Sequence, residues 1–141
     1  MKYFLDSNVI IDVVNKVQDA IDSLKIILEE KDSEIYINQL VEMESLRTIT
    51  YKQEQSKHLY TKTREILNQF IKLEMNPDIF ERAKDFSRYC HSNGLNIKGK
   101  CASVDYLHFM TAKYYDLQIV TYDGDMDKLE EKYNEFINAQ N

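Results

Sequence analysis

The feature that most constrains the fold is a series of short β-type runs, each followed by a stretch with helical periodicity. These runs cover residues 2–5, 34–37, 71–74 and 118–121. Strands that are separated by helices pair in parallel, because parallel neighbours need long crossover connections. The sequence therefore predicts an α/β class, in the form of a three-layer domain with a short parallel central sheet flanked by helices.

Residues that favour turns and helix caps mark where the helices begin. Asp6 and Asn38 directly follow the first two runs, Asn76-Pro77 opens a third helical stretch, and Ser103 is the expected cap of a helix that reaches Tyr114. The polar, basic segment 52–64 is expected to lead into a helix that contains Ile66. Apolar spacing predicts the other helices over residues 9–14, 17–28, 41–49, 77–93 and 127–138.

The length of 141 residues and the lack of a linker predict a single domain over residues 1–141. The apolar stretch 9–14 contains Asp12 and is too short for a signal peptide core or a membrane span, so we expect a soluble, cytoplasmic protein. Two cysteines, Cys90 and Cys101, are too few for a disulfide framework, and both are expected to be reduced.

Four acidic residues are expected to gather at one edge of the sheet. Asp6 and Asp123 follow the first and last runs, and the carboxyl ends of parallel strands are where ligands bind. Glu44 belongs to the early turns of the helix that leaves the second run. Asp105 lies in the first turn of the helix expected from Ser103, where the helix dipole favours a negative charge.

Such a cluster of carboxylates predicts a bound cation, because desolvating several like charges without compensation is costly. Oxygen ligands without closely spaced His or Cys select Mg²⁺ or Mn²⁺, which promote attack on phosphorus by activating water. The net charge of −6 opposes binding of a polyanion unless a bound cation or a local basic patch offsets it.

In their order and spacing, four sequence motifs resemble those of the PIN-domain ribonucleases, of which the VapC-type toxins of toxin–antitoxin modules are common small members. The motifs are Tyr-Phe-Leu-Asp-Ser-Asn-Val-Ile-Ile from residue 3, Glu-Ser-Leu-Arg from residue 44, Ser-Val-Asp-Tyr-Leu-His-Phe-Met-Thr-Ala from residue 103, and Ile-Val-Thr-Tyr-Asp-Gly-Asp-Met from residue 119. Each motif is short, but together they span nearly the whole chain.

The resemblance implies a divalent-metal endoribonuclease whose catalytic and metal-binding residues are Asp6, Glu44, Asp105 and Asp123. Asn8 and Thr121 would orient these carboxylates, and Asp125 stays open as an alternative to Asp123 for the fourth acid. An RNA substrate, with tRNA as one candidate, a small antitoxin whose C-terminal segment occludes the site, and a homodimer are implied as partners.

Two weaker features carry alternatives. Lys98 and Lys100, a few residues before Asp105, could hold an RNA phosphate next to the metal, as could several basic residues of the segment 52–64. A solvated loop is the better explanation for most of them. A zinc site is disfavoured because the spacing of the possible ligands is irregular. These possible zinc ligands are Cys90, His91, Cys101 and His108.

Three other functions remain open at this stage. The chain could serve general RNA processing, or it could be a PIN-fold RNA-binding module with weak or no catalysis. A Mg²⁺-dependent phosphotransfer domain would also place an Asp after the first strand, but Asn8 stands where one such class needs a second acid.

Overall fold

The computed structural model describes residues 1–51, 53–95 and 102–140. These residues form two compact units, the first made of residues 1–74 and 117–122 and the second of residues 75–116 and 123–140. This division concerns packing, and the single domain expected over residues 1–141 stays a prediction. None of the helices in the described ranges is long and apolar enough to cross a membrane.

The first unit contains a four-stranded sheet in the order β3-β2-β1-β4, and all of its strand pairs are parallel. The central strand β1 places Phe4 and Leu5 in the core with no exposed surface, as expected for a strand that is covered on both faces. The predicted α/β class with a parallel sheet is confirmed. The strands are β1 (Lys2–Leu5), β2 (Glu34–Ile37), β3 (Ile71–Lys72) and β4 (Gln118–Val120).

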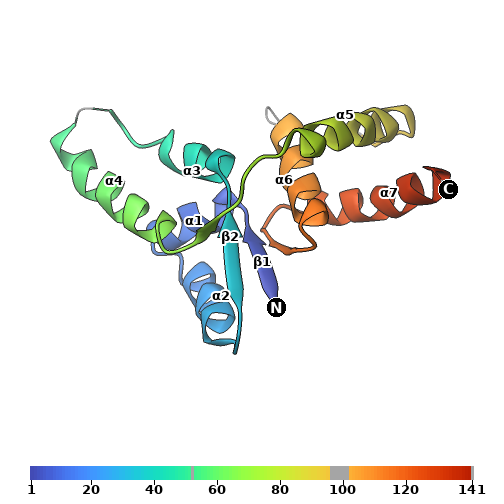
Figure 1. The fold of residues 1–141 in the computed structure, drawn as a ribbon. Coiled ribbons are helices and arrows are strands. Elements are labelled where there is room, and N and C mark those ends of the chain that lie inside the picture. Colours follow the sequence, from blue (N-terminus) through green and yellow to red (C-terminus); the bar gives the residue numbers. More distant parts are fainter. Residues whose placement is uncertain (52, 96–101, 141) are drawn as a thin grey trace. The chain divides into compact units, whose positions relative to one another are not determined.

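The helices of the first unit alternate with its strands, and α1 packs against the other three (Figure 1). Asn38 caps α3 as predicted, because its side chain accepts a hydrogen bond from the backbone N–H of Val41 at 2.9 Å. The helices are α1 (Ser7–Val14), α2 (Gln18–Glu29), α3 (Gln39–Leu46) and α4 (Glu54–Leu67).

The structure corrects several predicted helix boundaries. The helix predicted over residues 41–49 ends at Leu46. The helix expected only around Ile66 begins at Glu54, so most of the basic segment 52–64 is helical. Thr63 and Leu67, four residues apart, are its buried residues and anchor this long polar helix. Ser103 lies inside a helix that already begins at Ala102, so it does not precede that helix as an N-cap.

The second unit consists of α5 (Pro77–Ser92), α6 (Ala102–Tyr114) and α7 (Asp125–Gln140). Its core is aromatic. The ring of Phe86 has no exposed surface and lies 5.4 to 5.8 Å, between ring centroids, from four other rings. These rings belong to Tyr106, Phe109, Tyr133 and Phe136.

Candidate metal centre

Asp6 stands where β1 ends and α1 begins, and it is only 5% exposed. Its carboxylate accepts a hydrogen bond from the backbone N–H of Ser7 at 2.7 Å and caps the helix. Its own backbone N–H donates to the carbonyl of Val120 at 3.0 Å, which ties this residue to the end of β4. Asp6 is therefore a buried charge held by backbone on both sides at the carboxyl edge of the sheet.

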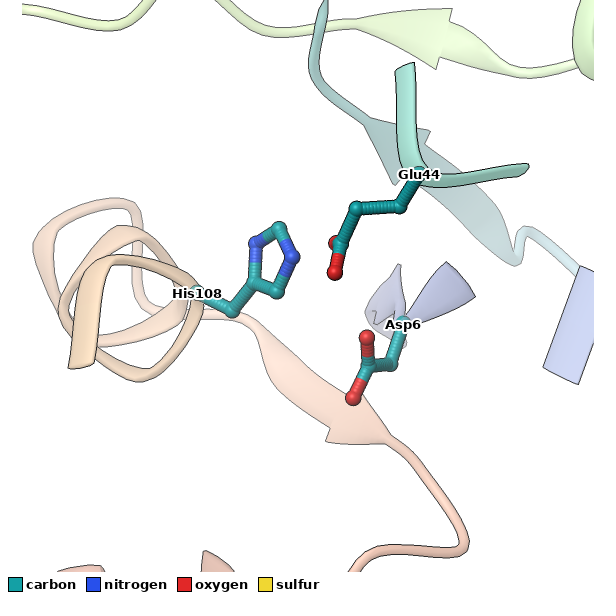
Figure 2. Close-up of side chains that lie close together, drawn as sticks. All are labelled: Asp6, Glu44 and His108. Carbon is teal, nitrogen blue, oxygen red and sulfur yellow. The ribbon is translucent and has the colours of Figure 1, made fainter. Parts of the chain in front are cut away.

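Glu44 supplies a second carboxylate from α3. Oxygens of Asp6 and Glu44 lie within 4.8 Å of each other, and Figure 2 shows the two side chains close together. Two oxygens bound to one Mg²⁺ at about 2.1 Å each lie no more than about 4.2 Å apart. The bound of 4.8 Å on the separation of the Asp6 and Glu44 oxygens is close to this limit, so the two carboxylates are near enough to share a hard divalent cation.

Thr121 and Asn8 form a hydrogen-bonded chain to Asp6 within the first unit. The hydroxyl of Thr121 donates to Oδ2 of Asp6 at 2.9 Å and accepts from Nδ2 of Asn8 at 3.1 Å. The backbone N–H of Tyr122 donates to Oδ1 of Asn8 at 3.4 Å, which sets the orientation of that amide. Because one oxygen of Asp6 caps α1 and the other accepts from Thr121, the carboxylate has a defined orientation.

Replacing Thr121 by Val is expected to weaken binding of Mn²⁺ by about 10- to 100-fold, the usual cost of losing a group that orients a metal ligand. The variant keeps the shape of the side chain but cannot donate to Asp6. Thr121→Ser keeps the hydroxyl and should bind Mn²⁺ nearly as the wild type does. Calorimetric titration measures the Mn²⁺ affinity of both variants and of the wild type. Equal affinities for the wild type and Thr121→Val would exclude a role of Thr121 in orienting Asp6.

Asp105 and Asp123 belong to the second unit. Asp105 lies in the first turn of α6, as predicted, and it is partly buried. Asp123 precedes α7, and its Oδ1 accepts from the backbone N–H of Asp125 at 2.9 Å. Asp125 is the first residue of α7 and pairs with Lys128 at 3.4 Å. The convergence of these acids with Asp6 and Glu44 stays a prediction.

Figure 2 also draws His108, a residue of the second unit that the sequence analysis considered only as a zinc ligand. His108 has no exposed surface. It follows Asp105 by three positions on α6, and residues at this spacing share one face of a helix. That spacing is the signal that would have marked His108 as a candidate nitrogen ligand.

The remaining residues near the motifs add no ligand to the candidate metal centre within the part of the chain that the structure describes. Burial raises the pKa of the Cys90 thiol, which disfavours the thiolate form that binds metals and acts as a nucleophile. Burial likewise raises the pKa of Tyr106, the residue after Asp105. Lys98, Lys100 and Cys101 lie outside the described residues. Phosphate contacts by the two lysines and a reduced Cys101 therefore stay predictions.

Comparison with known proteins identifies the fold. The family model for the PIN domain matches residues 3–132. The chain is similar to VapBC2 of Rickettsia felis, solved with a DNA fragment from the promoter, at 18% identity and a TM-score of 0.75 over 92% of this chain and 93% of that one. Among proteins with curated descriptions, the sequence comparison finds no significant match.

Two further solved structures show the same fold. A toxin–antitoxin complex from Klebsiella pneumoniae matches at 20% identity and a TM-score of 0.62, with 86% of each chain covered. VapC20 of Mycobacterium tuberculosis, described as a sarcin-ricin loop cleaving toxin, matches at 13% identity and a TM-score of 0.66 over 89% of this chain and 93% of that one. These likenesses confirm the resemblance drawn from the four motifs. The chain belongs to the PIN-domain family.

Proposed function

We propose that this protein is a divalent-metal-dependent endoribonuclease and the toxin of a type II toxin–antitoxin pair. The observation that carries the proposal is the close pair of Asp6 and Glu44 at the carboxyl edge of the parallel sheet of a PIN domain. Similarity to a solved toxin–antitoxin complex supports the toxin role and a small antitoxin as partner. The proposed site of action is the cytoplasm.

Asp6, Glu44, Asp105 and Asp123 are the proposed ligands of Mg²⁺ or Mn²⁺, with Asp125 as the alternative to Asp123. When bound, the cation would activate a water molecule and neutralise charge on the phosphoryl oxygens. The chain itself orients the ligands: Thr121 and Asn8 hold the carboxylate of Asp6, and α3 presents that of Glu44. His108 is a further candidate ligand, and a homodimer is the proposed assembly.

The test is cleavage of a mixed tRNA and mRNA pool by the purified protein with Mg²⁺ or Mn²⁺, and with EDTA in place of the metal. We expect discrete fragments with metal and at least a hundredfold slower cleavage in EDTA, because the carboxylates alone activate no water. Fragment ends mapped by sequencing would identify the target.

The alternatives have their own outcomes in this experiment. A folded protein that binds Mn²⁺ and RNA but cuts no substrate would favour the binding-module function. Covalent labelling of Asp6 by acetyl phosphate, with no RNA cleavage, would favour phosphotransfer. Cleavage by a protein with no neighbouring antitoxin gene would favour general RNA processing.

A further inference from the structure

A groove lies beside α3 and α4 in the first unit, and none of the residues that line it belongs to the candidate metal centre. Its volume is about 580 Å³, within the range of pockets that enclose small ligands. It is formed by the end of α3, the connection that follows and the first half of α4. The lining residues used below are Leu46, Arg47, Ile49, Tyr51, Lys57 and Tyr60.

The charge around this groove is opposite to that of the whole chain. Residues 47–64 contain five Lys or Arg residues and one acidic residue, in a chain whose net charge is −6. Arg47 and Lys57 line the groove itself. Lys57 lies 2.9 Å from Glu54, but both side chains are largely exposed, so this ion pair is weak and does not hold Lys57 away from an anionic ligand. The local charge therefore suits a polyanion.

The groove also presents aromatic rings. Tyr51 is 84% exposed and Tyr60 is 48% exposed, so both rings present surface to solvent. Leu46 and Ile49 add an apolar lining between them. Exposed aromatic rings combined with basic side chains are the pattern that binds single-stranded nucleic acid, since bases stack on the rings while cations contact the phosphates.

The groove is joined to the candidate metal centre by a single helix. Glu44 lies on α3, and Arg47, three residues later, is the C-cap of that helix. Residues at this spacing are neighbours on a helix surface, about 5–6 Å apart between Cβ atoms. A single-stranded nucleic acid that contacts Arg47 therefore lies within one helical turn of Glu44, a proposed catalytic carboxylate.

We infer that this groove binds a single-stranded segment of the RNA substrate next to the cleavage site, with Tyr51 and Tyr60 stacking on bases and Arg47 and Lys57 contacting phosphates. The inference rests on the proposed function, since it specifies how the nuclease holds its RNA. The inference assigns RNA binding to part of the basic segment 52–64. It also requires that the RNA be unpaired where it enters the groove.

The test is fluorescence anisotropy with a labelled 12-nucleotide single-stranded RNA of mixed sequence, in EDTA so that the probe stays intact. Tyr51→Ala/Tyr60→Ala should bind about tenfold more weakly or worse, because stacking is lost. Tyr51→Phe/Tyr60→Phe keeps the rings and should bind as the wild type does. Arg47→Gln/Lys57→Gln should bind more weakly and reduce the slope of log affinity against log salt by about 1.4.

A matched control removes two exposed lysines elsewhere, in Lys25→Gln/Lys84→Gln, and should leave affinity and salt slope near the wild-type values. Wild-type affinity in both groove variants would overturn the inference and leave the groove to a protein segment. If both groove variants bind RNA like the wild type and still cleave it, the proposed nuclease function is retained and only the groove inference fails. Groove-dependent binding without any cleavage would support the inference and count against the nuclease.

Discussion

Asp6→Asn is expected to reduce metal-dependent RNA cleavage by about a thousandfold or more while the protein stays folded. The rate should fall because the carboxylate ligands hold the cation, and the cation stabilises the charge that develops on the phosphoryl oxygens. The fold should survive because Asn caps helices as well as Asp does, so the hydrogen bond from the N–H of Ser7 can be kept. Glu44→Gln, on α3, should cause a loss of similar size.

The measurement is the initial rate of cleavage of one mapped RNA substrate, alongside thermal unfolding with and without Mn²⁺. Mn²⁺ should raise the melting temperature of the wild type, because a ligand that binds only the folded state stabilises it, and this rise should be lost in Asp6→Asn. Asp22→Asn removes an exposed acid of the same unit that is hydrogen-bonded to Gln18, and should keep both the rate and the Mn²⁺ effect. Full activity in Asp6→Asn would mean that the carboxylate pair is not the catalytic centre.

Local chemistry made part of this structure predictable. The change from Lys-Tyr-Phe-Leu to Asp-Ser-Asn fixes the end of β1, and Asp6 does cap α1. Asn38 caps α3 for the same reason, because its side chain bonds a backbone group three residues away. These two caps could be judged from sequence because each depends on a side chain and a backbone group within one turn of each other.

Boundaries set by burial were harder to predict. Ser103 has the side chain of a good cap, worth about 1 kcal/mol, but α6 begins one residue earlier. Burial of a run of residues on that helix, including Phe109 and Met110, contributes more to its stability than one cap does. The start of α4 was missed because Thr63 and Leu67 are too few to give a clear apolar pattern.

The candidate site was predictable only in its outline. The register sets Asp6 beside Asn38, the cap of α3, so Glu44 in the early turns of that helix could be expected near the same edge. The spacing of Asp6 and Glu44 depends on how α3 packs, which no local pattern records. The groove formed by Tyr51 and Tyr60 is likewise a product of helix packing, and the sequence shows only its charge.

Phe86→Ala is expected to lower the free energy of unfolding by about 3–5 kcal/mol, the usual range for removing a buried aromatic ring. Phe86 has no exposed surface, and four rings surround it at centroid distances of 5.4 to 5.8 Å. Truncation removes the shared partner of Tyr106, Phe109, Tyr133 and Phe136 and leaves a cavity that α5, α6 and α7 can close only in part.

The matched control lies six residues earlier on the same helix. Phe80 is 38% exposed, so Phe80→Ala should lower the free energy of unfolding by about 1 kcal/mol or less. Urea unfolding followed by circular dichroism gives both values, and the two variants make the same chemical change on α5. If Phe86→Ala were no more destabilising than Phe80→Ala, the aromatic cluster would not be the core of the second unit. A large difference would show that burial at Phe86, rather than aromatic content along α5, stabilises the packing of α6, the helix that carries Asp105 and His108.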